Sequence, residues 1–537
     1  MSHDREKQDD ASMKKDSGAE VDVVPVGPTT LKRQMKDRHI AMISIGGVIG
    51  TGLFVGTATA LREGGPVGML LAYMVVGSLC YTVMISLGEM AAFLPIPGGH
   101  LTFAERFVDP AWSFAVGWLY CYNWIIILPA EISAASVVIN YWNKSVNDAA
   151  WITMCLGVVF IINAFGAGAY GEAEFIFCTV KIVTIVGLLI LGIVLDLGGG
   201  PNHDRIGFRY WKSPGPFVQF DGIASTKGRF LGWSAVMAQA AFSFIGTEVV
   251  AIAGAEVKNP RRNIPKAIKR VYVRLLLFYV GGVTIIGLLV PSNDDRLNLN
   301  DGTAAASPFV IAISNAGIKA LPSVLDHVGG HSLPVPHTWL TCRIRHRTAV
   351  AGLSSWFGIG VTYIRFYRGL KAQGIDRMTL PYRAPLQPFA AWYATIGCFI
   401  VVLVKVNPSP RRRRCSRPLV PGWRQFSGWF VFLKGRWATD TFVTNYLPMV
   451  MFPVLYVGAK WYKHATLVPY AEMDFKSGLQ EVLDASYVIL RRPAGAALPD
   501  ASGILSFDEP PVSGNWAKRA WNWLVRRQYY YASNEKY

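Results

Sequence analysis

The sequence predicts an all-α polytopic membrane protein, built as inverted five-helix repeats in which the first and sixth helices are broken. The chain has 537 residues, of which 52% are apolar and only 16% charged, a composition too apolar for an ordinary soluble protein. Runs of about 20 apolar residues, the length that crosses a bilayer, recur to give about ten spans. Glycines interrupt two of these runs, the first and the sixth.

The first apolar run carries the main reason for expecting a broken helix. Between Ile43 and Gly56 it holds five glycines, at positions 46, 47, 50, 52 and 56. Each glycine inside a helix costs about 0.5–1 kcal/mol relative to alanine, and irregular backbone at membrane depth survives only beside a cavity or buried in protein. An opened helix offers N–H groups to an anion and carbonyl groups to a cation, the two charged ends of an amino acid. The alternative is a glycine face for close helix packing.

The first part of the chain divides into a polar tail and seven spans. Residues 1–39 are hydrophilic, lack the apolar core of a signal peptide, and are expected to form a disordered cytoplasmic tail. Residues 40–322 hold the spans, which we place at 40–61, 66–88, 112–140, 149–168, 174–196, 231–254 and 272–291. The loop at 255–271 carries six basic residues, so we expect it on the cytoplasmic side. Asp294 and Asp295 follow the seventh span, so we expect that segment on the outer side.

The sixth span repeats the pattern of the first. The stretch Phe242–Glu248 places Gly246 and the ionisable Glu248 in mid-membrane. Two broken helices in an inverted repeat would hold a substrate between them near the midplane of the bilayer. The net charge of +18 gathers in the tails and alternate loops, as an orientation signal does, so we expect membrane lipid and no nucleic acid as a partner. Seven cysteines lie scattered without metal-ligand spacing, so we expect no metal site and no cofactor.

The pattern fails after the seventh span. Residues 323–348 contain histidines, prolines and glycines in place of an apolar run, and we expect an irregular segment there. Residues 349–460 hold the remaining spans, but 404–425 interrupt them with four consecutive arginines, each costing about 2.5–3.5 kcal/mol at a helix centre. Removing 404–425 would join two apolar stretches into one span of 22 residues, so we interpret this insert as a translated intron. Residues 461–537 are expected to be a cytoplasmic tail.

Several motifs of the chain are specific when taken together. They are GGVIGTGLF at 46–54, GGP at 64–66, RFVDP at 106–110, GWLYCYNW at 117–124, FGAGAYGEAEF at 165–175 and FSFIGTEVVAIAGAEVKNPRRNIPKAI at 242–268. These motifs resemble those of fungal amino-acid permeases, which form the yeast amino-acid transporter family of the amino acid–polyamine–organocation superfamily. The stretches GGGPNHDRIGFRYW at 198–211 and LLVPSNDDRL at 288–297 are most similar to the dicarboxylic amino-acid permease branch.

The resemblance implies a twelve-span importer that couples amino-acid entry to protons in the plasma membrane, with both termini cytoplasmic. It favours acidic or neutral amino acids as substrates, and it implies ubiquitin-dependent trafficking machinery acting on the cytoplasmic tails. Against twelve spans, this chain lacks the eighth and ninth, and we interpret 324–348 as a misread exon boundary or frameshift where they were lost.

The resemblance also assigns the substrate-binding residues. The substrate carboxylate would meet the backbone N–H groups of Gly50, Thr51 and Gly52, and the ammonium group would meet the carbonyl groups of Val48, Phe242 and Ile245. Phe242 or Phe244 would act as an aromatic gate, and Ser243 completes the expected set. Broken backbone would thus supply both ends of a zwitterion without a buried charge.

Four ionisable residues inside the spans are candidates for proton coupling or gating. Lys181 lies about nine residues into the fifth span, too deep to reach the interface easily, and is expected to carry the proton unless it is permanently paired. Glu131 would tune substrate choice or proton coupling, and Glu248 would brace the broken sixth helix or take part in coupling. Glu89, at the inner end of the second span, would help to close the inner gate.

Other classes of protein remain as alternatives. A nutrient sensor with a transporter fold would bind amino acids without moving them, and a defective gene model would yield a product without function. We do not expect an enzyme, because a membrane enzyme needs paired reactive groups on facing helices. The one histidine cluster, at 327, 331, 337 and 346, lies in the segment that breaks the family pattern.

Overall fold

The computed structural model describes residues 35–54, 56–142, 146–220, 223–254, 256–257, 260–297, 307–318, 338–403 and 439–477. All of them belong to one compact unit, Met1–Leu483. The expected N-terminal tail up to residue 34, the stretch 323–337, the insert at 404–425 and the C-terminal tail beyond 477 lie outside the described residues.

The described residues are almost entirely helical. The first half contains α1 (Asp37–Gly46), α2 (Thr51–Phe54), α3 (Gly56–Phe93), α4 (His100–Phe107), α5 (Pro110–Trp142), α6 (Asp148–Ala164), α7 (Gly166–Asp196) and α8 (Arg209–Lys212). The second half contains α9 (Ser225–Phe244), α10 (Val249–Gly254), α11 (Pro260–Arg274), the π-helix η2 (Leu275–Val280), α12 (Gly281–Leu289), η3 (Asp295–Leu297), α13 (Pro308–Asn315), α15 (Thr338–Ala372), η7 (Arg377–Thr379), α16 (Phe389–Leu403), α17 (Thr439–Lys463) and η9 (Tyr470–Glu472). Among these residues the only extended pairing is a single bridge between Met35 and Val257.

Long apolar helices confirm the predicted all-α polytopic membrane fold. Five helical stretches of the described residues are long and apolar enough to cross a membrane, namely Gly56–Phe93, Pro110–Pro129, Gly168–Asp196, Ser225–Gly254 and Pro260–Leu289. Two shorter apolar helices cover Ala149–Ala164 and Phe389–Leu403. The first and second spans meet at Gly65, whose φ of 74° breaks α3 just before Pro66.

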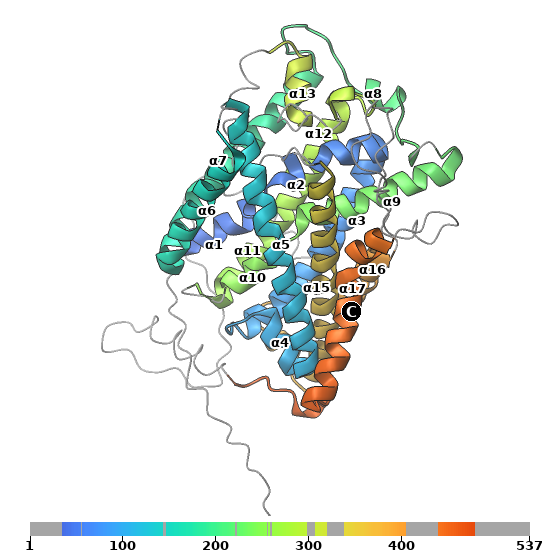
Figure 1. The fold of residues 1–537 in the computed structure, drawn as a ribbon. Helices are drawn as coiled ribbons and strands as arrows, with labels where there is room; N and C mark the ends of the chain where they lie inside the picture. The colour runs from blue at the N-terminus through green and yellow to red at the C-terminus, as the bar shows by residue number, and fades with distance from the viewer. Residues whose placement is uncertain are drawn as a thin grey trace, which may run out of the picture. The chain divides into compact units, whose positions relative to one another are not determined.

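The helix α3 lies at the centre of this unit. It packs against α9 most extensively, and also against α11, α12, α15 and α16. Small residues on α3 and α9 allow this close contact, since both helices are rich in alanine, glycine and serine. On another side, α15 packs against α5 and α17, and Figure 1 shows these three helices side by side.

Two helix starts differ from the sequence-based expectation. The seventh span begins at Pro260, not at 272, so most of the expected loop at 255–271 is helical. The cause is amphipathicity: apolar residues recur every three or four positions and are buried, while basic residues occupy the outer face and lower the average hydropathy. The helix α15 begins at Thr338, inside the segment 323–348 that we expected to be irregular, because no glycine or proline follows Pro336 until Gly352.

Candidate functional site

The first span is broken between α1 and α2. The helix α1 ends at Gly46, and α2 begins at Thr51 after four residues outside any helix. A tight turn joins them: the N–H of Ile49 donates to the carbonyl of Gly46 (3.1 Å), and that of Leu53 donates to the carbonyl of Gly50 (3.1 Å). The first N–H groups of α2 have no partner in a preceding helical turn, because the helix starts anew there.

The sixth span is broken between α9 and α10. The helical ladder of α9 ends where the N–H of Ile245 donates to the carbonyl of Ala241 (3.2 Å). Ile245 is extended, and Gly246 has a φ of 92°, a value that side chains disfavour. The fully buried carboxylate of Glu248 accepts hydrogen bonds from the N–H of Gly246 (3.2 Å) and from the indole N–H of Trp356 (3.1 Å). Glu248 therefore lies where a residue that braces this break would lie.

The two breaks face each other. The helix α2 packs against α9, and α1 packs against α10. A Cβ atom added to Gly52 would lie 2.7 Å from the Cα of Ser243, so these two backbones approach as closely as glycine permits. Among the residues that the structure describes, none has a heavy atom within 4 Å of a Cβ added to Gly50, its chain neighbours aside. The structure thus pairs one close backbone contact with open space two residues earlier.

Aromatic residues surround the sixth break. The ring of Phe244 is fully buried, with its centroid 5.8 Å from that of Tyr73 and 4.5 Å from that of Tyr279. The hydroxyl of Tyr73 lies 3.0 Å from Oγ of Ser243. Phe242 is only partly buried. Of the two residues considered for an aromatic gate, Phe244 is fixed in a packed cluster, so Phe242 is the one with exposed ring surface.

The seventh span supplies two residues, Arg274 and Tyr279, whose contacts sequence reasoning missed. The hydroxyl of Tyr279 donates to the carbonyl of Val48 (3.0 Å). The guanidinium of Arg274 donates to the carbonyl of Ser44 (2.9 Å) and to the hydroxyl of Thr247 (3.0 Å). The seventh span was expected to begin at 272, which would put Arg274 near the end of the span. With the helix starting at Pro260, the same arginine lies deep within the span.

The remaining candidate residues lie on α7 and α5. The helix α7 packs against α1, where a Cβ on Gly46 would lie 2.7 Å from the Cβ of Cys178. Lys181 follows Cys178 by one helical turn, is partly buried, and forms no hydrogen bond or ion pair with the residues that the structure describes. Glu131 is partly buried on α5, which packs chiefly against α15 and α17.

Metal binding has no support in the part of the chain that the structure describes. No group of three histidine, cysteine, aspartate or glutamate side chains there could hold a metal ion.

Comparison with known proteins decides the family. A family model described as "Amino acid permease" matches residues 39–328, which is more than half of the chain. The chain belongs to the amino-acid permease family. It is 34% identical to the dicarboxylic amino acid permease of Saccharomyces cerevisiae, over 85% of this chain and 81% of the relative. It is also 34% identical to the lysine-specific permease of the same yeast, over 84% and 79%, and 33% identical to the proline-specific permease of Emericella nidulans, over 92% and 94%.

Each of these alignments is longer than the number of residues of this permease that it includes. The alignment with the dicarboxylic relative runs over 517 residues, about 60 more than 85% of this 537-residue chain. The alignment with the proline-specific relative, over 558 residues and 92% of the chain, shows the same excess of about 60. The relatives therefore have that many residues without a counterpart in this permease.

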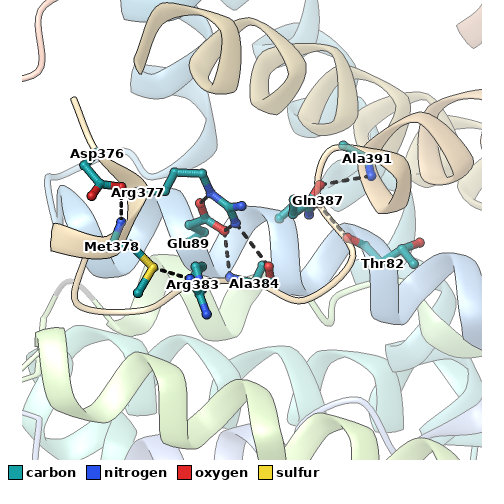
Figure 2. A network of polar contacts seen from close by, with 10 residues as sticks. Thr82, Glu89, Asp376, Arg377, Met378, Arg383, Ala384, Gln387 and Ala391 are labelled. Carbon is teal, nitrogen blue, oxygen red and sulfur yellow. Dashed lines mark hydrogen bonds and ion pairs between the residues drawn. The ribbon is translucent and has the colours of Figure 1, made fainter. Parts of the chain in front are cut away.

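A polar cluster joins the C-terminal end of α3 to the loop between α15 and α16 (Figure 2). The carboxylate of Glu89 is fully buried and accepts two hydrogen bonds from the guanidinium of Arg377, both 2.8 Å long, and one from the N–H of Ala384 (2.7 Å). The same guanidinium donates to the carbonyl of Ala384 (3.1 Å). Nearby, Gln387 donates to the hydroxyl of Ser86 (2.7 Å). Glu89 thus ties the second span to this loop of the permease.

Proposed function

We propose that this permease imports amino acids across the plasma membrane, coupled to proton entry, and that it holds its substrate where the two helix breaks meet. Family membership supports amino-acid transport across a membrane, since the relatives are named as permeases and not as enzymes. The observation that carries the site is the open space beside Gly50, next to the close contact of Gly52 with Ser243.

The broken backbone supplies groups for both ends of an amino acid. The substrate carboxylate would accept hydrogen bonds from the N–H groups at the start of α2, at Gly50, Thr51 and Gly52, where the helix dipole also favours negative charge. The ammonium group would donate to the carbonyl groups of Val48 and Ile245. Val48 already accepts a bond from Tyr279, but a carbonyl oxygen has two lone pairs and can accept a second.

The ammonium site extends along the end of α9. The carbonyl of Phe242 follows Ala241, the last acceptor of the helical ladder, and the ring of Phe242 would cover the bound substrate. Ser243 makes the close contact with Gly52 through its backbone, and its hydroxyl lies beside the hydroxyl of Tyr73. The substrate side chain would extend past these residues.

Proton coupling would depend on Lys181, with Glu131 and Glu248 as contributors. A lysine within a span is costly to keep charged unless it is paired or reaches water, so its proton can be taken up and released within the transport cycle. Lys181 suits this role because α7 contacts α1 directly at Cys178 and Gly46. A change in the charge of Lys181 would therefore act next to the first break.

The substrate class is proposed to be acidic or neutral amino acids. The dicarboxylic relative supports it, but lysine-specific and proline-specific relatives have almost the same identity. Overall identity therefore does not separate the substrates. A second carboxylate would need an additional donor or positive group in the site.

Uptake in a permease-deficient fungal host tests this proposal. Radiolabelled glutamate should accumulate in the cells, and unlabelled aspartate and neutral amino acids should be the strongest competitors of its uptake. The accumulation should stop when a protonophore is added. Accumulation that survives the protonophore would contradict proton coupling. Stronger competition by arginine or lysine would contradict the substrate class and leave the permease assignment intact. The same proposal predicts that a tagged protein reaches the cell surface. Both of its termini should be accessible only from the cytoplasmic side, and its tails should be ubiquitinated.

A second candidate is a chain that binds amino acids and does not transport them, either as a sensor or as the product of a defective gene model. The observations that favour it are the excess of about 60 aligned positions in the relatives and the end of the family match at residue 328. That end falls within 324–348, where we propose that the eighth and ninth spans are missing. Binding without uptake would favour this candidate, and sequencing the transcript would show whether 404–425 and 324–348 are encoded as written.

A further inference from the structure

The seventh span contains one turn of π-helix, Leu275–Val280, between two α-helical parts. The N–H of Gly281 donates to the carbonyl of Leu276, five residues earlier, in place of the usual four. Turns of this kind are rare and occur often at functional sites. What this turn does can be read from the residues at its two ends.

The π-turn places Arg274 and Tyr279 on the same side of the span. In an α-helix, two residues five positions apart point about 140° away from each other. A hydrogen-bonded step of five residues brings them nearly above one another. Both side chains are buried, with relative exposures of 1% and 0%.

Each of these two side chains touches both broken helices. Arg274 donates to the carbonyl of Ser44 on α1 and to the hydroxyl of Thr247 in the sixth-span break. Tyr279 donates to the carbonyl of Val48 in the first-span break. Its ring packs against Phe244, the last residue of α9.

The contacts have a clear order along the span. Arg274 meets the end of α1 that precedes the first break, and Tyr279 meets the break itself. Both bonds to the first span use backbone carbonyl groups, so they fix its backbone and not its side chains. A buried guanidinium is expensive unless its N–H groups are bonded, which favours the conformation in which Ser44 and Thr247 both accept. The seventh span therefore holds the two breaks at one separation.

We propose that the π-turn of the seventh span is a positioning element for the substrate site, with Arg274 and Tyr279 as its two positioning residues. The proposal rests on the proposed function, since the two breaks it aligns are those proposed to hold the substrate. Neither residue needs to touch the substrate. Tyr279 sets the position of the Val48 carbonyl, and Arg274 keeps α1 and the sixth-span break together below it.

Hydrogen–deuterium exchange of the purified full chain tests the positioning directly, without any substrate. In Tyr279→Phe, which loses only the hydroxyl, amides in a peptide covering 44–54 should exchange about tenfold faster, the factor expected for one lost hydrogen bond. Tyr272→Phe is the matched control: it loses the same hydroxyl on the same helix, from a side chain that is 44% exposed. Equal exchange in the two variants would overturn the proposal.

Transport and binding kinetics give the second arm, with labelled L-glutamate, L-alanine and L-lysine as probes. For each probe that the unaltered chain takes up or binds, Tyr279→Phe should raise KM or Kd about tenfold. The factor should be the same for every probe, and the maximal rate should change little. Arg274→Gln should lose uptake and Arg274→Lys should recover part of it, because an ammonium can still donate to one or both acceptors. Unchanged KM in Tyr279→Phe, or equal loss in both arginine variants, would overturn the positioning role. An unaltered chain that neither binds nor takes up any probe would instead contradict the proposed function, and the exchange experiment would still decide the inference.

Discussion

Replacement of two neighbouring glycines by alanine should separate packing from substrate binding. At Gly52 the added Cβ would lie 2.7 Å from the Cα and 2.8 Å from Oγ of Ser243. Real Cβ atoms do not approach that closely, and the obstacle is backbone, so α2 and α9 must move apart. Overpacking of this kind costs about 1–3 kcal/mol. At Gly50 the added Cβ meets no heavy atom of the described part of the chain within 4 Å, so the fold should tolerate it.

The expected results are opposite for the two variants. Gly52→Ala should lower the free energy of unfolding by about 1–3 kcal/mol and reduce uptake of every substrate together, and Gly52→Val should do more of both. Gly50→Ala should keep stability within about 1 kcal/mol, or gain slightly, because alanine restricts the unfolded chain. It should nevertheless raise KM at least tenfold, because its methyl group fills the space proposed for the carboxylate.

Thermal unfolding in detergent and initial rates of uptake measure the two quantities separately. Surface amounts of each variant must be matched before the rates are compared. A Gly52→Ala protein with unchanged melting temperature would refute the close contact between the two breaks. A Gly50→Ala protein with unchanged KM would refute the placement of the substrate beside Gly50, whatever its stability.

Three further predictions follow from single residues. Lys181→Met should abolish uphill accumulation while exchange across the membrane continues in part; full accumulation would exclude Lys181 from coupling. Arg377→Met should lower the free energy of unfolding by about 2–3 kcal/mol, below the full value for a buried pair because Arg377 is 21% exposed. Adding Glu89→Gln to the same chain should restore part of this loss, and an additive loss would argue against the ion pair. Burial lowers the pKa of His100 from 6.5 to about 4, so as the pH decreases the unfolded chain binds a proton before the folded chain does. The free energy of unfolding should therefore fall by up to about 3 kcal/mol as the pH decreases from 6.5 to about 4. His100→Phe should remove this acid loss in unfolding measurements across that range, and an unchanged pH profile would contradict it.

The sequence was sufficient to predict both helix breaks. Glycine at 46, 47, 50 and 52, and again at 246, has a local cost in a helix that is independent of tertiary contacts. The structure places non-helical residues at both positions. The all-α membrane fold followed from hydropathy for the same reason, because bilayer thickness imposes a length on each span.

The partners of the two breaks were beyond the sequence. Tyr73, Arg274 and Tyr279 meet them only through tertiary packing, and nothing local distinguishes these residues from other polar residues of the spans. The π-turn is equally invisible, since it changes the direction of Tyr279 without changing the apolar pattern around it. The start of the seventh span was misplaced because an amphipathic helix with a basic face has low average hydropathy.

The substrate site that we propose lies around the two helix breaks of this permease. The described contacts that form the site come from residues 44–54 and 73, from 239–279, and from Trp356. In the site that we propose, binding depends on the alignment of the two breaks, whereas transport requires one half of the bundle to move against the other and so depends on every span. If the eighth and ninth spans are lost, the chain as written should therefore keep amino-acid binding and lose uphill uptake.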